Sequence, residues 1–273
     1  MAKNYLTYPT KNMRITQNYN GTVSHKPNST GTPKDYPWDE GCSGTGRDWM
    51  YCPCDKMKIM RIYGVNGPGT NTIWLQSTSK VVFADGTSDY AVLLVTHPDD
   101  DDLSKLKVGQ TFKRGEKICR EGKDDATGYH FHYSAGKGKY KASGWAQNSK
   151  NAWVLTLAGK TYKPEELFYI DPKFTKVLGA AGLKFKELPP TYTTGTYKVT
   201  TDVLNVRSGA GTSYAKKTYS KLTANARKQI LDIAGKKVDG YVEGMLCTVS
   251  KISGNWGKTP SGWICLDYCK KVK

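Results

Sequence analysis

Histidine is scarce in this chain, with four residues among 273. The four are His25, His97, His130 and His132. A site built on imidazole therefore has no surplus of side chains to draw on, and any such site must use these positions.

Long apolar runs are missing as well. No stretch approaches the ~20 apolar residues that a membrane-spanning helix needs, and no stretch joins a basic face to a long apolar one. The first residues, Met-Ala-Lys-Asn-Tyr-Leu-Thr-Tyr-Pro, lack the apolar segment of a signal peptide. We therefore predict no stable membrane insertion and accumulation in the cytoplasm of the cell that makes the chain.

Regular cysteine spacing is also absent. The seven cysteines are irregularly placed and include no Cys-x-x-Cys pair, which is unlike the disulfide framework of a secreted protein. Three of them, Cys42, Cys52 and Cys54, fall close together and suggest a structural metal site as one interpretation. We favour the other, in which Cys52 and Cys54 are small buried apolar residues.

Acidic residues are few, with 24 Asp and Glu against 41 Lys and Arg, and the net charge is +17. Residues 193–273 hold 14 Lys and Arg and five Asp and Glu, a net charge of +9. Such a surface attracts polyanions. Because the chain has no zinc-finger, helix-turn-helix or RNP motif and its lysines are scattered, we do not expect nucleic acid to be the partner.

The strongest local pattern is Gly128-Tyr129-His130-Phe131-His132-Tyr133. In a β-strand the side chains alternate between two faces, so both imidazoles would project from one face and Phe131 from the other. Two imidazoles on one rigid surface can share a metal and its water. An isolated His-x-His is a weak signal, so its neighbours in the sequence matter.

Several other segments precede this pair in order. They are Arg14–His25 with Gln-Asn-Tyr, Tyr36-Pro-Trp-Asp39, Cys52-Pro-Cys-Asp55, Val92-Leu-Leu-Val-Thr-His97 and Val108-Gly-Gln-Thr-Phe-Lys-Arg-Gly-Glu-Lys-Ile118. In this order they resemble the M23 family of zinc metallopeptidases, the LytM and lysostaphin type, which cut peptidoglycan peptides. The resemblance covers roughly residues 13–136 and implies an antiparallel-sheet peptidase domain.

Carried onto this chain, the resemblance makes His25, Asp39 and His132 the zinc ligands. Two imidazoles and one carboxylate leave a fourth position open for water, as catalytic zinc requires. His97 and His130 would flank that water, orient it and stabilise charge on the tetrahedral intermediate. The residues do not tell which of these two histidines carries the proton.

The chain departs from the family pattern at two points near these residues. The family places its first histidine and its aspartate a few residues apart, but here 13 residues separate His25 from Asp39, so Asp35 is a rival ligand. We favour Asp39 because it follows an apolar residue, as the family aspartate does. His97 is followed by the run Asp99–Asp102, which we interpret as a solvated loop, with a cation site or a substrate-shaping rim as the alternative.

Two prolines and several threonines near residue 190 indicate a domain boundary. We predict a peptidase domain at 1–188 with residues 151–175 packed on it, a linker at 189–195 and a second domain at 196–273. In the second domain, Leu204-Asn-Val-Arg-Ser-Gly209 and the segments around Trp256 and Trp263 resemble the bacterial SH3 (SH3b) fold. Apolar residues at helical spacing in 222–234 predict a helix inserted into that barrel. The overall fold class is therefore mainly β.

SH3b modules usually bind wall peptides or glycans in grooves lined by aromatic residues. The candidates here are Trp256, Trp263, Tyr241 and Tyr268, of which at least half are expected to be core residues. The basic charge adds anionic wall polymers as expected partners.

The leading functional hypothesis is a zinc endopeptidase that cleaves an amide bond in the stem peptide or cross-bridge of peptidoglycan. A wall hydrolase without an export signal is similar to a phage endolysin, which acts on the wall after release from the cytoplasm; an autolysin that lacks a signal peptide is the other possibility. The alternatives are a zinc N-acetylmuramoyl-L-alanine amidase and a non-catalytic wall-binding protein with a degenerate peptidase fold.

Overall fold

The computed structural model describes residues 3–20, 25, 36–41, 47–64, 70–123, 126, 128–142, 145–147, 153–155 and 161–272. The chain divides into two compact units, Met1–Leu188 and Pro189–Lys273. Each unit has its own cluster of buried apolar side chains. The fold class is mainly β with antiparallel sheets, as the sequence predicts.

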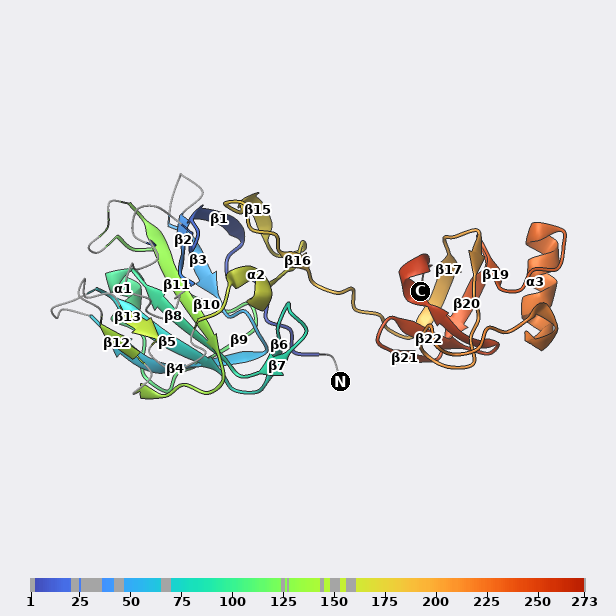
Figure 1. Cartoon of the computed structure of the whole chain (residues 1–273), viewed down its shortest axis with the longest axis horizontal. Helices are drawn as coiled ribbons and strands as arrows, with labels where there is room; N and C mark the ends of the chain where they lie inside the picture. The colour runs from blue at the N-terminus through green and yellow to red at the C-terminus, as the bar shows by residue number, and fades with distance from the viewer. Residues whose placement is uncertain are drawn as a thin grey trace. The chain divides into compact units, whose positions relative to one another are not determined.

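An eight-stranded sheet forms the first unit, in the order β15-β1-β2-β11-β8-β5-β4-β9. Neighbouring strands are antiparallel except for β1 and β15, which are parallel. Figure 1 shows the long strand β11 running through this unit. The strands are β1 (Asn12–Gln17), β2 (Trp38–Gly41), β4 (Lys56–Tyr63), β5 (Thr72–Ser77), β8 (Ala91–Thr96), β9 (Thr111–Lys113), β11 (His130–Lys137) and β15 (Lys176–Gly179).

Shorter elements complete the first unit. Four two-stranded sheets pair β3 with β10, β6 with β7, β12 with β13 and β14 with β16. Their bounds, with those of two short helices, are β3 (Trp49–Tyr51), β6 (Val81–Val82), β7 (Ser88–Asp89), β10 (Lys117–Arg120), β12 (Trp145–Gln147), β13 (Trp153–Leu155), β14 (Tyr169–Ile170), β16 (Lys186–Glu187), α1 (Asp100–Leu103) and α2 (Pro164–Leu167).

The central strands of the eight-stranded sheet are buried, so the sheet is a rigid support. In β8 the run Ala-Val-Leu-Leu-Val is buried throughout, which is the pattern of a strand covered on both faces. Phe168 directly follows α2 and is fully buried, with its ring centroid 5.7 Å from that of Trp38 and 5.8 Å from that of Tyr8. The segment that carries Phe168 is therefore packed on the first unit.

The cysteines of the Cys-Pro-Cys turn lie in the core. Cys52 is 2% exposed and Cys54 is 0% exposed, and both belong to the main apolar cluster. The Cys52 thiol donates to the backbone oxygen of Phe112 at 3.2 Å. The prediction that these two residues are small buried apolar groups is confirmed, and Cys42 lies outside the described residues.

The second unit contains three small antiparallel sheets, in the orders β20-β17-β24, β18-β19 and β21-β22-β23. Its core includes Leu204 and Val206, which alternate with Asn205 and Arg207 in the way a strand-like segment requires. The elements are β17 (Gly195–Val199), β18 (Val203–Leu204), η2 (Tyr219–Lys221), α3 (Ala224–Ala234), β19 (Tyr241–Val242), β20 (Leu246–Val249), β21 (Lys251–Ser253), β22 (Trp256–Thr259), β23 (Gly262–Cys265), η3 (Leu266–Tyr268) and β24 (Cys269–Lys271).

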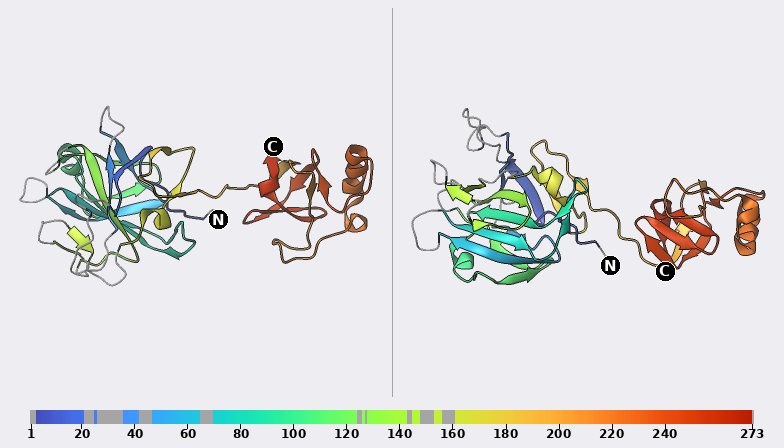
Figure 2. Two further views of the ribbon diagram at one scale, coloured as in Figure 1. Left: turned by 45° about the horizontal axis from the view of Figure 1, so that its top comes forward. Right: turned by 60° about the horizontal axis from the view of Figure 1, so that its bottom comes forward.

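The predicted helix is α3, which stands to one side of the strands of this unit (Figure 2). It begins after Thr223, whose hydroxyl accepts a hydrogen bond from the Ala226 amide at 3.4 Å. It ends at Gly235, which has a φ of +67° and closes the last turn. Ala226 and Ile230 face the core, so one stripe of the helix anchors it. Within the described part of the chain, no helix has the length and apolar character needed to cross a membrane.

Glu121 is one of two carboxylic acids in the described part of the first unit that are fully buried, and the other is Glu40. Glu121 is 0% exposed, and its Oε2 atom accepts a hydrogen bond from the Asp48 amide at 3.2 Å. Its Oε1 atom has no hydrogen-bond partner among the described residues. Burial, with the nearby charges of Asp48 and Glu40, raises the pKa of Glu121 to about 9.

This pKa makes the stability of the fold depend on pH. Between the ordinary pKa of 4.5 and the raised value of about 9, the unfolded chain loses the Glu121 proton and the folded chain keeps it. The folded state binds more protons in that window, so stability falls as the pH rises through it. Below that window the acid is protonated in both states and the effect disappears.

Glu121→Gln should remove this loss of stability, because the amide keeps the shape of the acid and cannot ionise. At about 1.4 kcal/mol per pKa unit, the variant should gain up to about 4 kcal/mol on its parent between about pH 5 and about pH 8. Urea unfolding at the two pH values measures the difference. Glu187→Gln, at an exposed glutamate, is the control, and an equal response of both variants would contradict the assignment.

Candidate functional site

Two adjacent strands, β2 and β11, bring two of the candidate metal ligands together. Asp39 on β2 lies directly opposite His132 on β11 and opposite Gln17 on β1. On its other side His132 lies opposite Thr96, the last residue of β8 before His97. The sheet register therefore places residues that are more than 90 positions apart in the sequence side by side.

The predicted alternation of the His-x-His strand is present. In β11 the side chains of Phe131 and Tyr133 are fully buried, and those of His130 and His132 are each 21% exposed. The two imidazoles therefore share the face of the sheet that meets solvent, and the aromatic rings fill the core behind them.

The donor atoms of His25, Asp39 and His132 form a small triangle. Asp39 Oδ1 lies 3.0 Å from His132 Nδ1 and 3.3 Å from His25 Nε2. The two nitrogens are 3.3 Å apart. Among the described residues this is the group of His, Cys, Asp and Glu side chains whose donor atoms could hold a metal ion.

The triangle has the size that zinc requires. Zinc binds histidine nitrogen and carboxylate oxygen at about 2.0–2.2 Å, so two ligands of a tetrahedral site lie about 3.3 Å apart. Three atoms with lone pairs that face one another at this distance repel unless a proton or a cation lies between them. The donor set therefore fits zinc in both chemistry and spacing, and its three ligands leave one position of a tetrahedron unfilled.

Neighbouring polar groups orient two of these side chains. The Gln17 amide donates to Asp39 Oδ2 at 2.9 Å, which leaves Oδ1 directed at the histidines. His25 Nδ1 bonds the backbone oxygen of Asn18 at 3.0 Å, so this nitrogen carries the proton and Nε2 keeps its lone pair. Gln17 and Asn18 belong to the Gln-Asn-Tyr lead-in, whose supporting role the sequence did not reveal.

The surroundings keep Asp39 ionised. Burial favours the neutral acid, but hydrogen bonds and charge interactions with His132 and His25 outweigh it and lower the pKa of Asp39 below its usual range. Burial also lowers the pKa of His130, and the proximity of His97 and His132 acts in the same direction. The result is an anionic carboxylate beside a neutral imidazole.

His97 and His130 form a second pair at the edge of the triangle. Their ring centroids are 4.6 Å apart, and His130 Nε2 lies 3.9 Å from Asp39 Oδ1. His97 has a φ of +64°, in the left-handed region that residues other than glycine seldom adopt. The backbone amide of His97 donates to the backbone oxygen of Asn71 at 2.9 Å. The backbone oxygen of His97 accepts from the Gly122 amide at 2.6 Å. All four histidines therefore lie at one site.

The acidic run Asp99–Asp102 is not the solvated loop that the sequence predicts. Asp100 and Asp101 are exposed, but Asp99 and Asp102 are each only 8% exposed. Asp102 pairs with Arg120 at 2.8 Å, and Asp99 pairs with Arg47 and with Arg120. The run forms the short helix α1 and is held to β10 by ion pairs, because buried carboxylates need partners.

Asp35, the rival of Asp39 in the sequence, lies outside the described residues. The structure places Asp39 next to both histidines.

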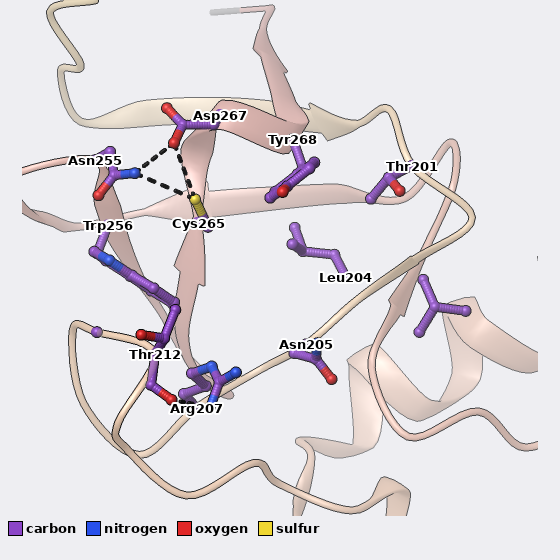
Figure 3. A pocket seen from close by; sticks show the side chains of 12 residues that line it. Thr201, Leu204, Asn205, Arg207, Thr212, Asn255, Trp256, Cys265, Asp267 and Tyr268 are labelled. Carbon is purple, nitrogen blue, oxygen red and sulfur yellow. Dashed lines mark hydrogen bonds between the residues drawn. The ribbon is translucent and has the colours of Figure 1, made fainter. Parts of the chain in front are cut away.

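A groove of about 790 Å³ lies in the second unit. Figure 3 shows Asn255, Cys265 and Asp267 at one end and Arg207 with Thr212 at the other, with Trp256 between them. Leu204 and Tyr268 also line the groove, and Tyr268 is 53% exposed. Trp256 and Tyr268, two of the four predicted binding residues, are therefore at this surface.

The other two predicted residues are placed differently. Tyr241 is 2% exposed in the core, where its hydroxyl bonds Thr259 at 2.8 Å, so it is a core residue and not a binding residue. Trp263 is half-buried on β23 opposite Lys258 and does not line the groove. The polar groove residues Asn205 and Arg207 belong to the Leu-Asn-Val-Arg motif, whose alternation was the available signal for them.

Comparison with known proteins gives structural similarity only. The chain matches no protein-family model and no curated protein sequence. Lysostaphin from Staphylococcus simulans is similar over 97% of this chain and 92% of its own, with 14% identity and a TM-score of 0.36. Csd3 from Helicobacter pylori is similar over 59% of this chain, with 16% identity and a TM-score of 0.32, and the match spans 37% of the Csd3 chain. A zinc-containing peptidase from Vibrio cholerae has 20% identity over 49% of this chain and 36% of its own, with a TM-score of 0.31.

These similarities are too weak to carry a functional assignment. The mainly β fold and the His and Asp cluster define a protein with a candidate three-ligand metal centre beside two further histidines. Any activity must be argued from that centre.

Proposed function

We propose that this chain is a zinc metallopeptidase that hydrolyses an amide bond in the stem peptide or cross-bridge of peptidoglycan. The observation that carries the proposal is the triangle of His25, Asp39 and His132, whose edges of 3.0–3.3 Å match a zinc site. The resemblance of the ordered motifs to M23 peptidases supplies the substrate class. When bound, zinc supplies a Lewis acid for the scissile carbonyl and makes water acidic enough to react near neutral pH.

His130 is the better placed of the two remaining histidines to accept a proton. Its Nδ1 atom lies 2.9 Å from the backbone oxygen of Gly128, so Nδ1 carries the hydrogen and donates it there. Its Nε2 atom therefore keeps a lone pair on the side of Asp39, and the lowered pKa of the ring keeps it neutral. A neutral imidazole in this position can take the proton of an attacking water and return it to the leaving amine.

We further propose that the second unit is an SH3b-type module that binds the cell wall. Its groove combines aromatic rings with polar side chains, as carbohydrate and peptide grooves do. The net charge of +9 on residues 193–273 favours walls that carry anionic polymers.

Tyr268→Ala should weaken wall binding, because it removes an exposed ring from the groove without opening the core. A ring at the centre of an interface is worth about 2 kcal/mol, so we expect roughly thirtyfold weaker binding of the full chain to purified sacculi. Leu246→Ala removes a side chain that is 51% exposed and outside the groove, and should bind like the parent. Unchanged binding of Tyr268→Ala would reject the groove as the wall-binding surface.

Digestion of purified peptidoglycan, followed by mass spectrometry of the products, tests the proposed activity. A new amine on a residue within the stem or bridge identifies an endopeptidase. A freed lactyl carboxyl on muramic acid identifies an amidase instead. A zinc-loaded protein that releases neither product would reject hydrolysis altogether.

A further inference from the structure

A cavity of about 320 Å³ in the first unit lies next to the pair formed by His97 and His130. Two of its lining residues, Pro98 and Tyr129, are the chain neighbours of these histidines. A third, Gly122, donates its amide hydrogen to the His97 oxygen at 2.6 Å and accepts from the His130 amide at 3.1 Å. The backbone segments that carry both histidines therefore lie next to this cavity.

The backbone is tightly packed at this wall. A Cβ atom on Gly122 would lie 2.9 Å from the His97 oxygen and 3.0 Å from Pro98. No side chain fits there, so glycine lets the two histidine-bearing segments approach each other. The cavity and the histidines thus share one rigid support.

One wall of the cavity offers a carboxylate. Asp100 is exposed, and its Oδ1 atom accepts a hydrogen bond from the Asn71 amide at 2.6 Å. Asn71 also donates to the Pro98 oxygen at 3.1 Å, which holds its side chain in place. Oδ2 of Asp100 has no partner within the described ranges. The neighbouring Asp99 is different, because Arg47 and Arg120 already neutralise it.

Another part of the lining offers an ammonium group and an aromatic ring. Lys123 Nζ lies 5.2 Å from the centre of the Tyr129 ring. Lys123 forms no ion pair with any residue that the structure describes. Tyr129 is 40% exposed, so its ring is accessible to a ligand. The lining therefore pairs a negative charge with a positive one around an apolar surface.

We propose that this cavity is a substrate subsite for a residue whose side chain ends in both an ammonium and a carboxylate group, as in a diamino dicarboxylic acid. Asp100 pairs with the ammonium group, Lys123 pairs with the carboxylate, and the methylene chain packs on Tyr129. The volume of about 320 Å³ lies at the small end of the range for ligand pockets. The inference rests on the proposed function, and it names a stem-peptide residue, rather than a neutral glycine bridge, as the group bound next to the histidine-bearing segments.

Binding is measured first, because it requires no catalysis. The full chain is titrated with free meso-diaminopimelate, with pimelate, which lacks the amines, and with 1,5-diaminopentane, which lacks the carboxylates. The amide resonances of Gly122 and Tyr129 should shift with meso-diaminopimelate and at least about tenfold more weakly with either half-ligand, since each loses one charge pair. Asp100→Asn and Lys123→Gln should lose this preference, and Asp101→Asn, an exposed neighbour outside the lining, should keep it. Equal responses to all three ligands would overturn the proposal.

Kinetics then separates the subsite from the activity itself. The zinc-loaded protein is given muropeptides that carry meso-diaminopimelate, its carboxamide or lysine at the same position. We expect kcat/KM to be about tenfold or more higher for the free diacid, and Asp100→Asn to remove that difference while Asp101→Asn preserves it. A parent that cleaves all three equally would overturn the subsite alone. A parent that cleaves none would reject the proposed function, and the titration would still decide the subsite.

Discussion

His132→Ala should leave the protein folded and without zinc. His132 supplies one of three donor atoms, and its side chain is 21% exposed on the open face of the sheet, so its removal creates no cavity in the core. With two donors left, zinc should fall well below one equivalent. Activity should drop by more than the ~10–100-fold that loss of a ligand's hydrogen-bonding partner costs. Zinc content by mass spectrometry and muropeptide release are the two measurements.

A pair of aspartate variants provides the matched control. Asp39→Ala should lose zinc as His132→Ala does, because Asp39 Oδ1 lies within 3.3 Å of both histidine nitrogens. Asp35→Ala should keep zinc and activity. The reverse outcome would make Asp35 the ligand, and full zinc content in His132→Ala would reject the triangle as the metal centre.

Gln17→Ala should also weaken zinc binding, but less than His132→Ala does. The Gln17 amide holds Asp39 Oδ2 at 2.9 Å and leaves Oδ1 facing the histidines. Its loss should weaken zinc affinity by about 10–100-fold without changing the ligand set. Competition with a zinc chelator measures this affinity, and a value equal to that of the parent would show that Gln17 does not orient the carboxylate.

The candidate site was predictable from sequence to the extent that its parts are local. The alternation of His130, Phe131 and His132 indicates a strand with two imidazoles on one face, and the structure confirms both the strand and the burial of Phe131. The apolar run that ends at His97 likewise predicts β8. Periodicity of this kind depends only on neighbouring residues, so a single sequence contains it.

Contacts between distant segments were not predictable in the same way. Gln17 meets Asp39 because β1 and β2 pair in one particular register, and a shift of one residue would turn the amide away from the carboxylate. Tyr241 shows the same limit in the second unit, since an aromatic residue in a short strand suits a groove and a core equally well. Its burial depends on the strands and helix packed around it. Register and packing are set by the whole fold, which local patterns do not encode.

The left-handed backbone at His97 was also invisible in the sequence. Histidine enters this conformation less readily than glycine or asparagine, and here two hydrogen bonds hold it, from the His97 amide to Asn71 and from the Gly122 amide to His97. The strain is local to the one histidine that follows β8 directly. It fixes the direction in which the imidazole leaves the strand.

Variants at His97 and His130 should keep zinc and lose turnover, which separates them from His132→Ala. Neither residue belongs to the triangle of donor atoms, and the His130 Nε2 atom lies 3.9 Å from Asp39 Oδ1 with its lone pair available for a proton. Removing a general base or an orienting imidazole costs about 10²–10⁴-fold in rate. We therefore expect about one equivalent of zinc, a kcat lower by about that factor and a KM close to that of the parent.

The choice of variant matters at His97, because its φ of +64° penalises alanine. Asparagine enters this region more readily, so His97→Asn removes the imidazole with less backbone strain, and His130→Ala suits the strand position of the other histidine. Zinc content, thermal unfolding and kcat are measured on both variants. Loss of zinc in either would make that histidine a ligand. Retention of full kcat in both would move the proton transfer to a group outside this pair.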